Sequence, residues 1–273
     1  MAALANGEAT SSAEARPMLT TDGEVVHWLT TFYSQVARNG LDMRSSPFVH
    51  PCVFRRELKS CPPPASRFTE EGASCEEQEE TINVWKERQI IENRLVEIHN
   101  LTTTSLSRLL LEKPSNKKDL EVEELVRQLF TKTQNLWQAA PSQLNEAFQP
   151  WEAWVVAESI RRSMFSAIMI RGLWYAAAHG YVYYEPFFES IPFDPRAGVW
   201  EAETEEDWNQ RIRERGGGHT KLKSYHEFIE TSGLKLKLEE DGAFQRMLFI
   251  CYNGSGGIRA LEELDKSYDR NRA

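Results

Sequence analysis

The sequence predicts an all-α protein, and three observations carry that prediction. Apolar residues recur at helical spacing in several long segments of the chain. Prolines such as Pro114 and Pro141 separate those segments, and proline ends a helix because it lacks the amide hydrogen that the helix needs. No segment sustains the alternation of apolar and polar residues that is typical of a half-buried strand, and no internal repeat is present.

The first half of the chain is expected to hold three helices. Apolar residues share one face between Val25 and Val36, between Thr81 and Leu111, and again between Asp119 and Gln138. Six glutamates and no basic residue lie between Glu70 and Glu80, so this run is expected to be a solvated loop or a frayed helix start. Asp119 is the expected N-cap of the third helix.

The longest helix is expected from Trp151 to about His179. It is apolar on nearly every face, so we expect it to be the buried central helix around which the others pack. Shorter helices should follow from Thr204, which is a suitable N-cap, and from Ser224, where Ser and Glu three residues apart form a capping box. The last two are expected at 244–251 and 258–264.

Length and composition predict one folded domain. The 273 residues, of which 41% are hydrophobic and 27% charged, can bury a self-sufficient core. Residues 1–20 have little to bury, so they are expected to form a disordered tail. Residues 21–265 are expected to form a single helical domain around the central helix.

Charge and cysteine content exclude several classes of function. The 41 acidic and 32 basic residues give a net charge of −9. This charge argues against unassisted DNA binding, because protein surfaces that bind nucleic acid need clustered positive charge.

The four cysteines form no CxxC pair, and no histidine lies at a zinc-ligand spacing from them, so neither a metal nor another cofactor is expected. We find no secretory signal and no apolar run long enough to span a membrane, so the thiols are expected to be reduced inside the cell.

Three charged residues stand out inside the central helix. Glu158 lies three residues before Arg161 and four before Arg162, a spacing that places both guanidinium groups beside the carboxylate. One interpretation is a catalytic acid with an anion clamp, and the other is a structural ion-pair cluster. The second is favoured because no nucleophile or base accompanies the three residues, so we expect no catalytic residue and no enzyme.

A row of aromatic residues follows the central helix. Together with Trp174, the side chains of Tyr183, Tyr184 and Phe187 could line an apolar ligand pocket. In an all-α core such residues more often serve packing. Both interpretations stay open from the sequence.

The central helix also carries a motif. Its sequence from Trp151 to Ser163, WEAWVVAESIRRS, resembles the W-x-x-W-x-x-A-E-S-x-R-R-T signature in the C-terminal regulatory region of fungal zinc-binuclear-cluster transcription factors. Further pieces are similar to the same family in the same order: SPFVHP at 46–51, IPFD at 191–194, VWEA at 199–202 followed by Trp208, SYHEF at 224–228, and FQRML at 244–248. The resemblance covers about residues 20–260.

The resemblance implies a regulatory domain without its DNA-reading module. Members of the family normally carry six cysteines around two zinc ions at the start of the chain, whereas residues 1–45 contain no cysteine here. It therefore implies a regulator of a fungal secondary-metabolite gene cluster, with a polyketide cluster as the first expectation. The regulator would act in the nucleus, could also occur in the cytoplasm, and could enter the nucleus together with a partner. Its partner would be a DNA-binding transcription factor or another regulatory protein, through which it would contact DNA only indirectly. The protein could be a monomer, a homo-oligomer or a hetero-oligomer.

A second hypothesis belongs to another class of protein. The chain would be a ligand-binding or accessory biosynthetic protein of such a cluster, one that kept the domain without regulating transcription. Its site would be the apolar pocket of Trp174, Tyr183, Tyr184 and Phe187. Transcript levels in a deletion strain distinguish the two hypotheses.

Overall fold

The structure, a computed structural model, describes residues 23–39, 47–53, 75–111, 116–139, 150–179, 187–196, 198–215, 221–232 and 242–272. The expected tail, residues 1–20, lies outside these ranges. The all-α prediction is confirmed, since the described chain is made almost entirely of helices. The helices are α1 (Gly23–Asn39), α3 (Cys75–Leu111), α4 (Asn116–Ala139), α6 (Pro150–His179), α7 (Glu205–Glu214), α8 (Tyr225–Ser232), α9 (Ala243–Asn253), α10 (Ser255–Arg272) and the short 3-10 helix η3 (Phe188–Ser190).

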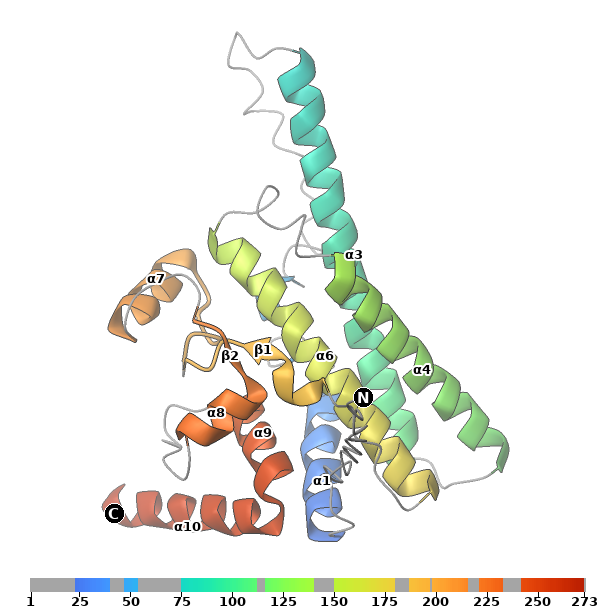
Figure 1. Ribbon diagram of the computed structural model, residues 1–273, viewed down its shortest axis with the longest axis vertical. Coiled ribbons are helices and arrows are strands. Elements are labelled where there is room, and N and C mark those ends of the chain that lie inside the picture. Colours follow the sequence, from blue (N-terminus) through green and yellow to red (C-terminus); the bar gives the residue numbers. More distant parts are fainter. Residues whose placement is uncertain are drawn as a thin grey trace, which may run out of the picture.

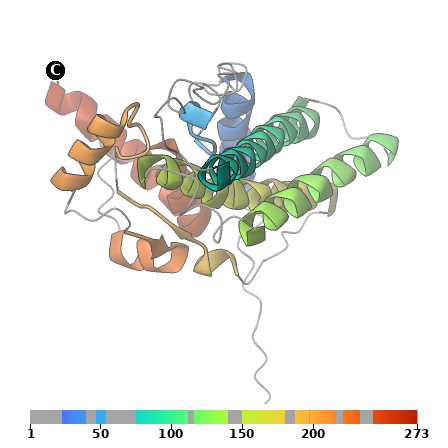
Figure 2. The ribbon, with the colours of Figure 1, turned by 90° about the horizontal axis from the view of Figure 1, so that it is seen from above.

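Helix α6 lies at the centre of the molecule. Figure 2 shows it between α3 and α4 on one side and the elements from α7 to α10 on the other. Nine consecutive residues, 162–170, are buried, and nine residues make more than two full turns, so every face of the helix is covered there. The predicted central position is confirmed. In the described part of the chain no helix is both long and apolar enough to cross a membrane.

Helices α3 and α4 lie side by side and run in opposite directions (Figure 1). Two ion pairs mark the direction: Lys132 Nζ lies 2.6 Å from a Glu97 carboxylate oxygen, and Arg108 Nη1 lies 3.1 Å from Glu121. These pairs are solvent-exposed and contribute little. The stability of the hairpin comes from its buried apolar side chains, among them Leu95, Leu106, Val126 and Leu129.

A short ribbon joins two segments that follow α6. Strand β1 (Pro192–Phe193) pairs antiparallel with β2 (Lys223–Ser224), and the Tyr225 amide donates to the Ile191 carbonyl at 3.2 Å. The ribbon holds α8 against η3. Strands of two residues are too short to show an alternation, so the sequence does not predict this ribbon.

Helix boundaries differ from the expectation in several places. Helix α3 begins at Cys75, not Thr81, so part of the acidic run is helical, which suits glutamates near the positive end of the helix dipole. With 37 residues α3 is longer than α6, which has 30, so the expectation that the central helix is the longest is wrong. Helix α4 begins at Asn116, three residues before the expected cap. Helix α10 continues to Arg272, where the expectation ended at residue 264. Glu262 and Lys266, oppositely charged and four residues apart, favour the first of the extra turns.

Two predicted helix starts are found as expected. Thr204 precedes α7, and its Oγ1 accepts a hydrogen bond from the Asp207 amide at 3.2 Å. Ser224 Oγ accepts the Glu227 amide at 3.1 Å at the start of α8. Each bond satisfies an amide that the helix itself leaves without an acceptor.

Gly254 joins α9 to α10 in a conformation that only glycine adopts readily. Its φ is 61° and its ψ is −144°, and its amide donates to the Ile250 carbonyl at 2.8 Å. Gly254→Ala should therefore lower the free energy of unfolding by about 1–3 kcal/mol. Gly256→Ala is the matched control, since an added Cβ there meets nothing within 4 Å and the residue is helical. Chemical denaturation measures both, and an equal effect of the two substitutions would contradict the strain at Gly254.

Candidate functional site

Glu158 lies at the centre of a buried network that holds α6 to other parts of the chain. Its side chain is fully buried. The carboxylate accepts hydrogen bonds from Arg161 Nη1 at 3.1 Å and from Arg162 Nε at 3.0 Å, each on a different oxygen. The backbone amide of Asp194 also donates to it, at 3.2 and 3.3 Å from the two oxygens. Both carboxylate oxygens are thus engaged from within the protein.

Arg162 extends the network in the other direction. It is 2% exposed, and its Nη1 donates to the Pro47 carbonyl at 3.4 Å. Its guanidinium carbon lies 3.9 Å from the centroid of the Trp200 ring and 4.6 Å from that of Phe244. Cation–π contacts of this kind replace part of the hydration that a buried cation loses. One side chain therefore contacts three segments that are remote in sequence.

Burial works against both charges of the Glu158–Arg162 pair. It raises the pKa of the Glu158 carboxyl, and the guanidinium groups of Arg162 and Arg161 oppose that rise. It lowers the pKa of Arg162, and the Glu158 carboxylate opposes that fall. Each charge is therefore tolerated because the other is present. An enclosed carboxylate with both oxygens occupied is suited to fixing the packing of α6.

A second buried ion pair lies next to the first. Asp194 is 1% exposed, and its Oδ2 accepts a hydrogen bond from Trp154 Nε1 at 3.0 Å. Arg196 Nε donates to Oδ1 of Asp194 at 2.9 Å, and the Arg196 amide donates to the same oxygen at 3.1 Å. Because the Asp194 amide donates to Glu158, the two ion pairs form one connected network across α6 and the segment after β1.

Residues 47–53, here called the strap, lie across α6. The His50 amide donates to Ser159 Oγ at 3.1 Å, and Ser159 Oγ donates to the Val155 carbonyl at 2.7 Å. With the bond from Arg162 to Pro47, this gives the strap two hydrogen-bonded attachments to α6. Phe48, Val49 and Val53 are buried with it.

Aromatic rings enclose the strap. The Phe48 ring lies 5.9 Å from Tyr33 of α1 and 6.3 Å from Phe244 of α9, measured between centroids. The His50 ring meets Trp200 edge to face at 5.0 Å and Trp154 at 6.5 Å. The strap thereby joins α1, α6, α9 and the segment before α7 in one core.

The network unites motif segments that are far apart in the sequence. It contains the strap, the start of α6, Asp194, Trp200 and Phe244, and Trp208 lies 5.9 Å from Trp154. Of the residues in this network, the sequence predicts a grouping only for Glu158, Arg161 and Arg162. His50, Asp194 and Trp200 occur there as members of motifs with no assigned role, and those motifs are the signal that could have found them.

The residues of the expected apolar pocket are found in different settings. Trp174 is 6% exposed and belongs to the core of α6, whereas Phe187 is 38% exposed just before η3. Tyr183 and Tyr184 lie outside the described residues. The pocket stays a prediction.

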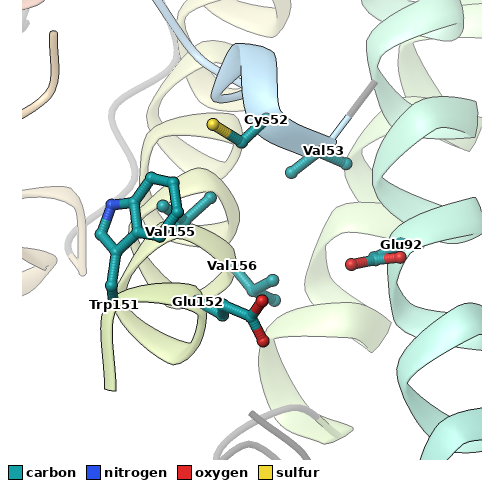
Figure 3. Close-up of a pocket in the computed structure, with 7 residues that line it drawn as sticks. All are labelled: Cys52, Val53, Glu92, Trp151, Glu152, Val155 and Val156. Carbon is teal, nitrogen blue, oxygen red and sulfur yellow. The ribbon is translucent and has the colours of Figure 1, made fainter. Parts of the chain in front are cut away.

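A cleft opens at a different place, between the strap, α3 and the start of α6 (Figure 3). It encloses about 220 Å³ of empty space, a volume that includes its open mouth. The residues that line it are Cys52, Val53, Glu92, Trp151, Glu152, Val155 and Val156.

Arg88 bridges the two acidic residues of this cleft. Its Nε lies 3.2 Å from a Glu92 carboxylate oxygen, and its Nη1 lies 3.0 Å from Glu152. Burial raises the pKa of Glu92, and Arg88 opposes that rise. This bridge links α3 to the first turn of α6. Trp154 and Glu158, which belong to the buried network, follow that turn along the same helix.

No metal centre is found within the described ranges, because no three His, Cys, Asp or Glu side chains come together there as ligands. No protein-family model matches the chain, and no curated protein or solved structure is significantly similar to it.

Proposed function

We propose that this chain regulates transcription of a fungal secondary-metabolite gene cluster. A polyketide gene cluster is the first candidate. The observation that carries the proposal is the meeting of the motif segments in one buried network. His50, Glu158, Asp194 and Trp200 come from four separate motifs, and their side chains or backbones are linked by the contacts given above.

Convergence of the motifs supports the resemblance in a way that the sequence alone does not. A chance series of short similarities gives no reason for an acid on α6 to bind the amide of the aspartate in IPFD, 36 residues later. It gives no reason either for the second arginine of the helix motif to stack on the tryptophan of VWEA. A shared regulatory fold would explain both contacts, because they place the segment after β1 and the segment before α7 against α6.

We further propose that the chain reaches DNA through a protein partner. The net charge of −9 disfavours a phosphate-binding surface. The 273 residues contain four cysteines, whereas a zinc-binuclear cluster uses six. The partner is a DNA-binding transcription factor or another regulatory protein, and the site of action is the nucleus.

Transcript abundance in a strain lacking this gene tests the regulatory proposal. A regulator is expected to change the transcripts of the whole neighbouring gene cluster together, and the wild-type gene returned at another locus should restore them. Unchanged transcripts with altered metabolites would instead support the accessory, ligand-binding alternative.

The partner mechanism has its own test. Purified chain is expected to give no shift of cluster promoter DNA, while chromatin immunoprecipitation should recover those promoters from cells. Promoter occupancy should disappear when the DNA-binding factor that copurifies with the chain is deleted. Specific binding of promoter DNA by the purified chain alone would overturn this mechanism.

A further inference from the structure

We propose that the strap is a pH-sensitive latch, released from α6 when His50 takes up a proton. The proposal goes beyond the regulatory function and does not depend on it. It rests on how the His50 ring is used within the strap and on which charges surround it.

The strap needs His50 in its neutral form. The Cys52 amide donates a hydrogen bond to His50 Nδ1 at 3.2 Å, so this nitrogen must keep its lone pair. A protonated imidazole has hydrogen on both nitrogens and cannot accept such a bond. The Val53 amide donates to the His50 carbonyl at 3.0 Å, so the same turn of backbone carries both interactions. Protonation therefore breaks a bond within the turn that orients the strap.

The surroundings of His50 also disfavour a positive charge. The residue is 2% exposed, and its ring packs on the Trp200 ring that also carries the Arg162 guanidinium, whose carbon lies 3.9 Å from the centroid. An imidazolium there would lose its hydration close to an existing cation.

The carboxylates near this place in the described structure are already engaged or exposed to solvent. On α6, Glu158 is paired with Arg161 and Arg162. After β1, Asp194 is paired with Arg196. Before α7, the side chains of Glu201 and Glu203 are exposed to solvent. The strap meets this segment through the Cys52 thiol, whose Sγ lies 3.9 Å from the backbone carbonyl oxygen of Glu203.

The sign of the pH dependence follows from linkage. In the released strap His50 faces water and has an ordinary pKa of about 6.5. The latched form holds the neutral ring, so latching is strongest above about pH 6.5 and weakens as the pH falls below it. If only the released strap binds the proton, lowering the pH from about 7.5 to 5.5 raises the released fraction about tenfold.

Hydrogen–deuterium exchange of the full chain tests the latch. The amides of His50, Cys52 and Val53 donate the bonds described above, so a peptide covering residues 47–53 reports release. After correction for the intrinsic pH dependence of exchange, its protection should fall about tenfold between pH 7.5 and 5.5. Peptides from α4 serve as the internal reference and should keep their protection.

His50→Asn removes the titration and keeps an acceptor near the place of Nδ1. Its strap should show less than a twofold change over the same pH range. His226→Asn is the matched control at an exposed histidine, 52% exposed and 3.2 Å from Glu230, and it should behave as wild type. An unchanged wild-type strap, an equal loss of protection in α4, or an equal response in His50→Asn would each overturn the proposal. The first two outcomes are measured on wild type alone, so they hold even if the variant fails to fold.

Discussion

Glu158→Ala is expected to lower the free energy of unfolding by about 3–5 kcal/mol. The substitution leaves Arg162, which is 2% exposed, without its carboxylate in the interior. It also removes the acceptor of the Asp194 amide, so the segment after β1 loses an attachment to α6. Urea denaturation of wild type and variant measures the difference.

Glu97→Ala is the matched control for this substitution. Glu97 pairs with Lys132 on the outside of the α3–α4 hairpin, and its side chain is 53% exposed. The expected change is below about 1 kcal/mol, because exposed ion pairs contribute little. A Glu158 variant as stable as the Glu97 variant would show that Glu158 does not hold a buried cation in place.

Phe165→Ala is expected to lower the free energy of unfolding by about 3–5 kcal/mol, because it leaves a cavity in the core. Phe165 is fully buried on α6. Four other rings meet it edge to face at centroid distances of 5.1 to 6.1 Å: Phe188, Phe193, Tyr225 and Phe244. Through them it joins η3, β1, α8 and α9 to the central helix.

Phe187→Ala removes the same ring from an exposed position and serves as the control. Phe187 is 38% exposed, so a loss of about 1 kcal/mol or less is expected. Thermal unfolding of both variants makes the comparison. Equal losses would contradict the placement of Phe165 at the centre of the aromatic core.

The sequence predicted the fold well where the signal is local. Helix α6 could be predicted to be central because its apolar residues leave no polar face, and nine consecutive buried residues agree with that. The cap at Thr204 was predictable because the bond to the Asp207 amide spans three residues. The β1–β2 ribbon was not, since its two segments pair Pro192 with Ser224 through tertiary packing and not through any local pattern.

The same distinction explains the candidate site. The spacing of Glu158, Arg161 and Arg162 places them together on any α-helix, so their grouping could be predicted. The contacts of Arg162 with Pro47 and of Glu158 with Asp194 span 115 and 36 residues, and periodicity carries no information on such contacts. The motifs marked the segments without showing that they meet.

A tethered reporter tests most directly the central claim, that the chain regulates transcription through protein contacts. The chain is fused to an unrelated DNA-binding module and expressed, in the fungus that carries the gene, with a reporter bearing the matching site. We expect the bound fusion to change reporter transcription severalfold, up or down, and the unfused chain to have no effect. A folded, promoter-bound fusion that leaves the reporter at the level of the module alone would contradict this claim.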